Sequence, residues 1–461
     1  MTPESPWRIP DFRTLFTATA LVQLSTNVGY VVIPLIAVTA LDASAGQVGA
    51  LATLGTVAFL LIGLPAGAWV DRMRHRRVLI AADLAKAVLY ASIPIAWAFG
   101  GLTLWQLYAV ALLSGCATVF FDIASQSVLP RLVGRGHLVQ ANAAVIGLMA
   151  LGNIAGRGAG GALVQLLTAP AAIVATAVGH FGSALRLAAL HRTPVPTTPA
   201  TPPGAETAPA PGLGRQIAEG VRHVLGNAEL RALALSAALV NLGYQLVNTL
   251  LPVLFVRELH LSAGALGLFW AAGGVGVLLG SRCARLIAAR VGYGRTLVLA
   301  GLAAVPAALL VPVIGDGFRL YVAGFGWLLL LFRTGVDNVL GVSLRQRMTP
   351  DALLGRMNAT FRFVLTGAMP VGAALAGLLG ELVGLHATLW VGGVMVALSF
   401  LPVLLSPIRS RRSLPDAAVV YGSAPPRPQA GADPAPGPPA PALPALPEPV
   451  LPAPPPPRPG P

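Results

Sequence analysis

The stretch LVQLSTNVGYVVIPLIAV, from Leu21 to Val38, is apolar enough to cross a lipid bilayer. A bilayer core about 30 Å thick needs roughly 20 apolar residues in a helix, and no Asp, Glu, Lys or Arg interrupts this stretch. A second stretch, LVNLGYQLVNTLLPVLFV, begins at Leu239 with a similar order of polar and apolar residues. Together the two stretches predict an integral membrane protein built from two related halves.

The composition of the chain also indicates a lipid environment. Of its 461 residues, 55% are hydrophobic and only 10% are charged, compared with about 25% charged residues in soluble domains. The net charge of +14 comes almost entirely from arginine, and we interpret these arginines as membrane-topology charges instead of a nucleic-acid surface. Cys116 and Cys283 lie in apolar runs, so we expect no metal site and no cofactor.

Twelve apolar stretches of sufficient length follow one another along the chain. The connections after even-numbered spans are rich in arginine, as in residues 72–77, whereas those after odd-numbered spans have almost none, Arg257 and Arg319 excepted. Because basic residues accumulate on the cytoplasmic side, we expect both termini there and the spans in a bacterial plasma membrane. The expected spans lie near 15–40, 47–69, 78–99, 104–127, 141–167, 170–190, 230–255, 264–287, 296–314, 320–343, 357–380 and 386–405.

The two halves repeat at a constant offset of 218 residues. This offset places Val22 on Val240 and Pro34 on Pro252. Two six-span halves built on one plan are typical of transporters that rock about a central site. We therefore expect an N-terminal bundle at 1–190, a Pro/Thr/Ala-rich linker with a short amphipathic segment at 191–229, a C-terminal bundle at 230–408 and a proline-rich tail at 409–461.

The linker and the tail are not predicted to enter the membrane. Their composition provides too little apolar surface to form a core, and the proline-dense tail is expected to be extended and polyproline-like. The tail is either a spacer or a docking segment for a proline-binding module.

After the second span the sequence reads GAWVDRMRHRRVL. This resembles the cytoplasmic signature G-x-L-a-D-R-x-G-R-K-x-x-L of the major facilitator superfamily, from which Trp69, Arg74 and His75 depart. The resemblance implies an all-α fold of twelve transmembrane helices in two pseudo-symmetric six-helix bundles around a central cavity. The positions that match are Gly67, Asp71, Arg72, Arg76 and Leu79.

This loop is expected to act as a latch at the inner gate. Gly67 would let two helices approach closely, and Asp71 would face the positive end of the eleventh span. Arg76 or Arg77 would reach Asp122, near the inner end of span four. The alternative is an ordinary positive-inside loop.

The stretch GNIAGRGAGG, residues 152–161, is glycine-rich but lies inside span five without a preceding strand. A dinucleotide-binding loop needs a strand before it, so a phosphate site is not expected. The stretch resembles the antiporter signature g-x-x-x-G-P-x-x-G-G, whose helix bends and seals the outer cavity in that family. Arg157 replaces the proline and is either functional or extends to the outer headgroups. The matching glycines are Gly152, Gly156, Gly160 and Gly161.

Further segments narrow the resemblance. FRTLF near the start, LPRLVGRGHLVQANA after span four and RQRMTPDALLGRMNA after span ten look like the drug–proton antiporter branch with bacterial macrolide and siderophore exporters. This implies a monomer that exports a small, largely hydrophobic molecule by proton antiport. Uptake, or a transporter-derived sensor or scaffold, is the alternative. No catalytic motif or P-loop supports an enzyme or ATP drive.

Few charged residues lie within the spans. Asp83 and Lys86 are expected to pair at i,i+3, and Arg333 and Asp337 at i,i+4. Asp337 is our candidate proton carrier, and His180 is either structural or part of transport. The candidates for substrate contact, with helix packing as the alternative, are Gln23, Asn27, Asn241, Gln245, Asn248 and Arg362.

Overall fold

The computed structural model describes residues 5–190 and 213–411, and within these ranges it contains helices and no strand. Twelve helical segments are long and apolar enough to cross a membrane, and they confirm the twelve expected spans. Spans four and five are two helices that follow each other within α4 and are separated by a kink at Gly134, whose backbone is non-helical with a φ of +67°. The helices are α1 (Pro10–Ala40), α2 (Ala45–Arg72), α3 (His75–Ala98), α4 (Leu104–Leu166), α5 (Ala169–Ala188), α6 (Leu213–Gly226), α7 (Ala228–Val253), α8 (Ala263–Val291), α9 (Tyr293–Leu310), α10 (Phe318–Arg347), α11 (Asp351–Leu382), α12 (Leu385–Leu398) and α13 (Leu401–Leu404), with short turns η1 (Pro6–Arg8), η2 (Leu254–Glu258), η3 (Val311–Val313) and η4 (Pro407–Ser410).

The 218-residue repeat is visible in the backbone as well as in the sequence. Asp42 and His260, one offset apart, both have a φ of +50° in the turn after the first helix of each half. Two residues later, Ser44 and Ser262 each cap the next helix by accepting a hydrogen bond from the backbone three residues on. The same backbone hydrogen bond of 2.8 Å closes both turns, from Ala43 N to Ala37 O and from Leu261 N to Phe255 O.

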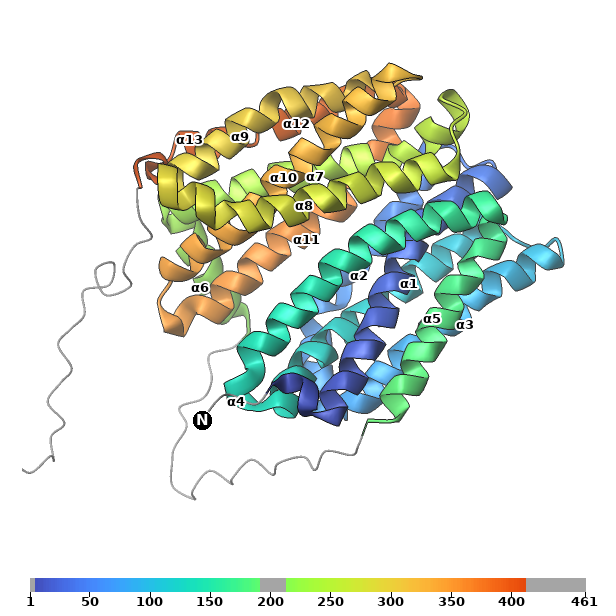
Figure 1. Cartoon of the computed structure of the whole chain (residues 1–461), viewed down its shortest axis with the longest axis horizontal. Coiled ribbons are helices and arrows are strands. Elements are labelled where there is room, and N and C mark those ends of the chain that lie inside the picture. Colours follow the sequence, from blue (N-terminus) through green and yellow to red (C-terminus); the bar gives the residue numbers. More distant parts are fainter. Residues whose placement is uncertain (1–4, 191–212, 412–461) are drawn as a thin grey trace, which may run out of the picture. The chain divides into compact units, whose positions relative to one another are not determined.

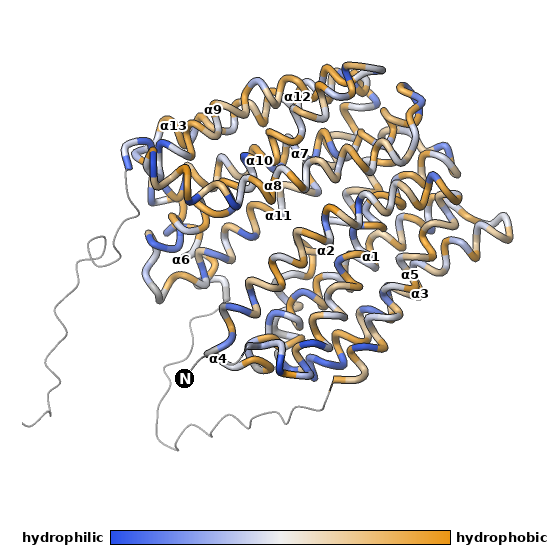
Figure 2. The backbone as a smooth tube through the Cα atoms, viewed as in Figure 1, coloured by the Kyte–Doolittle hydropathy of each residue, from blue (hydrophilic) through white to orange (hydrophobic). Residues whose placement is uncertain are grey.

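Helices α1–α5 pack mainly on one another, and so do α7–α13, which gives two helical halves (Figure 1). The halves contact each other chiefly through α2 with α11 and through α4 with α8. We call the end of the helices next to residues 73–74, 189–190 and 348–350 the linker end. The opposite end, next to residues 41–44, 259–262 and 383–384, is the hairpin end. Figure 2 shows hydrophobic residues along the helices and hydrophilic residues gathered mainly towards their ends.

The buried side chains divide differently at the two ends. One large core cluster contains residues of both halves, such as Val31 and Leu250, and extends towards the hairpin end. Near the linker end each half has its own cluster, around Phe12 and Leu79 in the first and around Phe361 in the second. Among the described residues, the hydrophobic core therefore joins the halves at the hairpin end and not at the linker end.

The amphipathic helix α6 packs against α11 at the linker end. A β-carbon on Gly220 would lie 2.8 Å from the carbonyl oxygen of Arg356, so glycine permits this approach. Glu219 forms an ion pair with Arg356, and Val224 is buried beneath the helix. The end of the linker is thus anchored to the second half.

Candidate functional site

Helices α2 and α11 meet backbone to backbone near the hairpin end. A β-carbon on Gly49 would lie 2.4 Å from the Cα of Gly377, a distance that only a glycine pair tolerates. One turn further out, the backbone N–H of Gly46 donates a 2.8 Å hydrogen bond to Oε1 of Glu381. This crossing therefore combines close glycine packing with one polar contact between the halves.

Helices α4 and α8 make a second crossing on the same plan. A β-carbon on Gly161 would lie 2.8 Å from the Cα of Gly267, and one on Gly264 would lie 2.0 Å from Oε1 of Gln165. Gly264 and Gly267 stand one repeat offset after Gly46 and Gly49. We call these two crossings together the hairpin-end gate; its residues are Gly46, Gly49, Gly377 and Glu381 in the first crossing and Gly161, Gln165, Gly264 and Gly267 in the second.

Towards the linker end, α2 and α11 no longer approach closely. Among the described residues, no neighbouring atom lies within 4 Å of a β-carbon placed on Gly67 of α2 or on Gly355 of α11. Within the described chain, the expected close helix approach at Gly67 is not made, whereas α2 and α11 still touch at mid-helix, where a β-carbon on Gly367 would lie 3.2 Å from Leu60. In the part of the chain that the structure describes, the two halves therefore pack most closely near the hairpin end.

The latch loop has different partners from those expected. The Arg76 guanidinium donates hydrogen bonds to the carbonyl oxygens of Leu187, at 3.2 Å, and of Ala188. Asp122 is the partner expected for Arg76 or Arg77; the observed hydrogen bonds of Arg76 go to the last carbonyls of α5 instead. Two other residues expected in the latch, Arg72 and Arg77, have exposed side chains. The side chain of Asp71 lies outside the described part of the chain.

Asp122 itself interacts electrostatically with Lys86 of its own half and with Arg362 of the other half. Arg362 also lies over the ring of Phe59 in α2, with its Cζ 4.8 Å from the ring centroid. A basic side chain of α11 thus contacts the first half at mid-helix, between the hairpin-end gate and the linker end.

Arg157 lies between the two halves, not towards lipid. Its Cζ is 4.6 Å from the ring centroid of Tyr30 in α1, and that ring makes an edge contact with Trp270 of α8 at 5.3 Å. The Nε of Arg157 is buried without a hydrogen-bond partner in the described chain. The Arg157 side chain therefore does not extend to the outer lipid headgroups.

Three other glycines of the 152–161 stretch face α1. β-Carbons on Gly152, Gly156 and Gly160 would lie within 3.0 Å of atoms of Gln23, Asn27 and Val31 respectively. Three glycines spaced by four residues thus form a flat strip on which three equally spaced side chains of α1 rest. Arg157 is positioned beside Tyr30 by this close packing.

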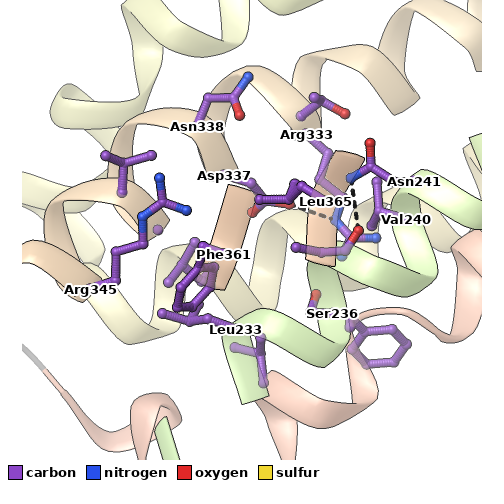
Figure 3. A pocket seen from close by; sticks show the side chains of 17 residues that line it. Leu233, Ser236, Val240, Asn241, Arg333, Asp337, Asn338, Arg345, Phe361 and Leu365 are labelled. Atoms are coloured by element: carbon purple, nitrogen blue, oxygen red, sulfur yellow. Dashed lines mark hydrogen bonds and ion pairs between the residues drawn. The ribbon is translucent and has the colours of Figure 1, made fainter. Parts of the chain in front are cut away.

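The second half contains a mainly apolar pocket of about 170 Å³ between α7, α10 and α11, with a few polar side chains in its wall. Asp337 lies in its wall, and Nε of Arg333 is 3.3 Å from the Asp337 carboxylate, as the spacing predicts. Arg333 is held by α12 through a 2.7 Å hydrogen bond to Ser399. Figure 3 shows Asp337 between Arg333 and Arg345, with Phe361 on the same side as Arg345.

The amide side chains proposed to contact substrate mostly bond to their own helices. Asn27 donates to the carbonyl of Gln23, and Asn241 and Asn248 donate to carbonyls four residues earlier. Gln245 donates to Thr249. Of these four, Asn241 also lines the Asp337 pocket, and Asn248 keeps a buried Oδ1 without a partner in the described residues.

A buried polar cluster in the first half was not anticipated. Asp83 accepts a 2.6 Å hydrogen bond from Ser183 and lies 3.0 Å from Nδ1 of His180, all three being fully buried. The expected direct pair with Lys86 is not made; Lys86 lies over the ring of Phe121 instead. The partners of Asp83 are about a hundred residues away in sequence, so helical spacing carries no signal for them.

Comparison with known proteins finds one family model and several transporters that are similar to this chain. A family model described as Major Facilitator Superfamily matches residues 15–336. The chain is 27% identical over 412 residues to an enterobactin exporter, EntS, of Salmonella choleraesuis (strain SC-B67), which covers 88% of this chain and 95% of the relative. It is 30% identical over 316 residues to an uncharacterized MFS-type transporter, y4rN, of Sinorhizobium fredii, covering 67% of this chain and 71% of the relative.

Solved structures share the fold. A bacterial homologue of the iron transporter ferroportin, in an inward-facing state, has a TM-score of 0.65 at 18% identity, covering 87% of this chain and 99% of that one. The nucleoside transporter NupG has a TM-score of 0.68 at 12% identity, covering 86% and 99%. With most of its length matched by the family and its fold shared with known transporters, the chain belongs to the major facilitator superfamily and is a multi-pass membrane transporter.

Proposed function

We propose that this transporter exports a small, largely hydrophobic molecule by alternating access, with proton antiport as the driving force. The observation that carries the proposal is the difference between the two ends. The halves pack together at the hairpin-end gate, while near the linker end each half keeps its own core. A repeat-based transporter moves substrate by rocking its halves between this arrangement and its opposite.

The orientation in the membrane follows from charge. Arginine-rich connections gather at the linker end, which we assign to the cytoplasm because basic loops stay on that side. Substrate would then enter between the halves from the cytoplasm and leave when the hairpin-end gate opens. The similarity to enterobactin exporters over 88% of the chain favours export over uptake.

The substrate is proposed to be neutral or anionic. Arg157 lies on Tyr30 between the halves, and its Nε has no hydrogen-bond partner among the described residues. Arg362 provides a second guanidinium between the halves. A planar guanidinium binds carboxylate or phenolate oxygens in a fixed geometry, whereas two cations would disfavour a cationic drug.

The proton carrier is proposed to be Asp337. It borders a pocket large enough for water and has a fixed cation, Arg333, as its neighbour. A carboxylate with this surrounding can change protonation when its exposure to water changes during the cycle.

The test is transport into inverted membrane vesicles, with a panel of anionic, neutral and cationic compounds and with or without a pH gradient. We expect uptake into these vesicles of an anionic or neutral compound, stimulated by an acidic interior. Accumulation only in right-side-out vesicles would indicate uptake into the cell. Binding without any transport would favour the sensor or scaffold alternative.

A further inference from the structure

We propose that Glu381 is a protonatable lock on the hairpin-end gate: its carboxylate holds α2 and α11 together, and protonation releases them. The inference rests on the proposed alternating access but not on the substrate or the direction of transport. It follows from the placement of one carboxylate at a helix terminus of the opposite half.

The first observation is where the carboxylate lies. α2 begins at Ala45, and the N–H groups of its first turn have no partner within the helix. Glu381 accepts the N–H of Gly46, the second residue of α2, at 2.8 Å. A negative charge at a helix N-terminus is stabilised by the helix dipole, so this charge draws the two halves together.

The second observation is the fit of the glycine. A β-carbon on Gly46 would lie 2.9 Å from Cγ of Glu381. Only the absence of a side chain at this position lets the carboxylate of α11 reach the start of α2. The contact is therefore built into the crossing.

The third observation is the repeat. In the other crossing, Gln165 rests on Gly264 as Glu381 rests on Gly46. Both side chains stand four residues after the glycine of the close contact, Gly161 and Gly377. A neutral amide thus satisfies the same packing, which means that packing alone does not require the negative charge of Glu381.

Protonation would remove that charge while leaving the shape intact. A hydrogen bond to an ionised acceptor is roughly twice as strong as a neutral one, and the attraction to the helix terminus disappears with the charge. Glu381 is exposed at this end, so protons reach it while the gate is closed. The same exposure screens the interaction, and a terminal charge of this kind changes an equilibrium about threefold.

Other ionisable groups face the same region, and the positive charge of Arg257 acts on the Glu381 carboxylate as well as on Asp42. Asp42 pairs with Arg257 of the other half at 2.5 Å, but its side chain is 95% exposed, where an ion pair contributes little. His386 pairs with Glu258 at 2.9 Å within the second half, so its protonation does not join the halves. These two pairs supply the controls.

The experiment measures the gate directly, without substrate. Cys116 and Cys283 are replaced by alanine, and spin labels are attached at Phe99→Cys and Phe318→Cys, two exposed hairpin-end positions in different halves. Distance distributions are recorded in lipid nanodiscs between about pH 7 and about pH 4, a range that spans glutamate protonation. We expect the separated population to rise about threefold on acidification.

Three sets of variants decide the assignment. Glu381→Gln should show at neutral pH the separated population that the parent shows in acid, and should lose the pH response. Gln165→Glu should add a second lock, with a smaller separated population at neutral pH and a stronger response. Asp42→Asn and His386→Gln should each keep the parental response.

The proposal is overturned if Glu381→Gln retains the parental pH response, if Gln165→Glu leaves it unchanged, or if the parent itself does not respond. Because no transported compound is present, a lack of transport in vesicles would count against the proposed function and leave the lock standing.

Discussion

Gly49 of α2 and Gly377 of α11 meet so closely that a β-carbon on the first would lie 2.4 Å from the Cα of the second. The two residues are more than three hundred positions apart and belong to different halves of the transporter. Their contact fixes how tightly the hairpin-end gate closes, because neither backbone can retreat without moving a whole helix.

Gly49→Ala should therefore weaken closure of the hairpin-end gate. The added methyl group overpacks the crossing, at a cost of about 1–3 kcal/mol to the closed arrangement, and spin-label distances across the gate should shift to longer values. Gly55→Ala in the same helix is the matched control, since nothing lies within 4 Å of its β-carbon. Equal behaviour of the two variants would show that this crossing does not limit closure.

Arg157→Leu and Arg157→Lys should both impair transport of an anionic compound in inverted vesicles. Leucine removes the charge, and lysine lacks the planar guanidinium that stacks on Tyr30 at 4.6 Å. Tyr30→Phe keeps the ring and should retain most activity. If cationic compounds are carried well by the parent and neither Arg157 variant affects any compound, Arg157 is a packing residue only.

Asp337→Asn should uncouple transport from the pH gradient. The amide keeps the size of the side chain but cannot carry a proton, so substrate should still equilibrate across the membrane without accumulating. The measurement compares proton flux and substrate flux in the same vesicles, with Ser343→Ala as the control, since Ser343 lies on the same helix and its hydroxyl donates to the carbonyl of Val339. Coupled accumulation by Asp337→Asn would place the proton site elsewhere.

Asp71→Asn should abolish most transport while leaving membrane insertion intact, if the signature loop stabilises the state closed at the linker end. Arg76→Gln should differ, because Arg76 bonds the last carbonyls of α5 and its loss would lower thermal stability. Expression, melting temperature and transport rate distinguish the two. Normal transport by Asp71→Asn at normal expression would refute the latch.

The docking of α6 should weaken in acid. Burial lowers the pKa of His223 below its ordinary value of about 6.5, and its Nε2 lies 3.4 Å from the Thr349 hydroxyl. The undocked helix therefore binds the proton more readily, so docking loses stability as the pH falls below about 6.5 towards the lowered pKa. Hydrogen exchange of residues 213–226 should accelerate in this range, and His223→Gln should remove the dependence.

Local sequence determined the secondary structure of this protein. Each span is a continuous apolar run, and hydropathy is a property of neighbouring residues, so the positions of all twelve follow from the order of residues along the chain. The repeat is equally visible in the sequence, because corresponding residues, such as Val22 and Val240 or Pro34 and Pro252, are separated by the same offset. The i,i+4 pair of Arg333 and Asp337 follows from helical geometry alone.

Tertiary structure alone decided which helices touch and which side chains meet. Asp83 takes His180 and Ser183 in place of the nearby Lys86, and Glu381 reaches Gly46 in the other half. Such contacts depend on how two helices cross, and the crossing is set by packing across the whole interface. A single sequence records the period of one helix but not its rotation against another. The spans are therefore determined locally, whereas the hairpin-end gate is determined by the folded protein.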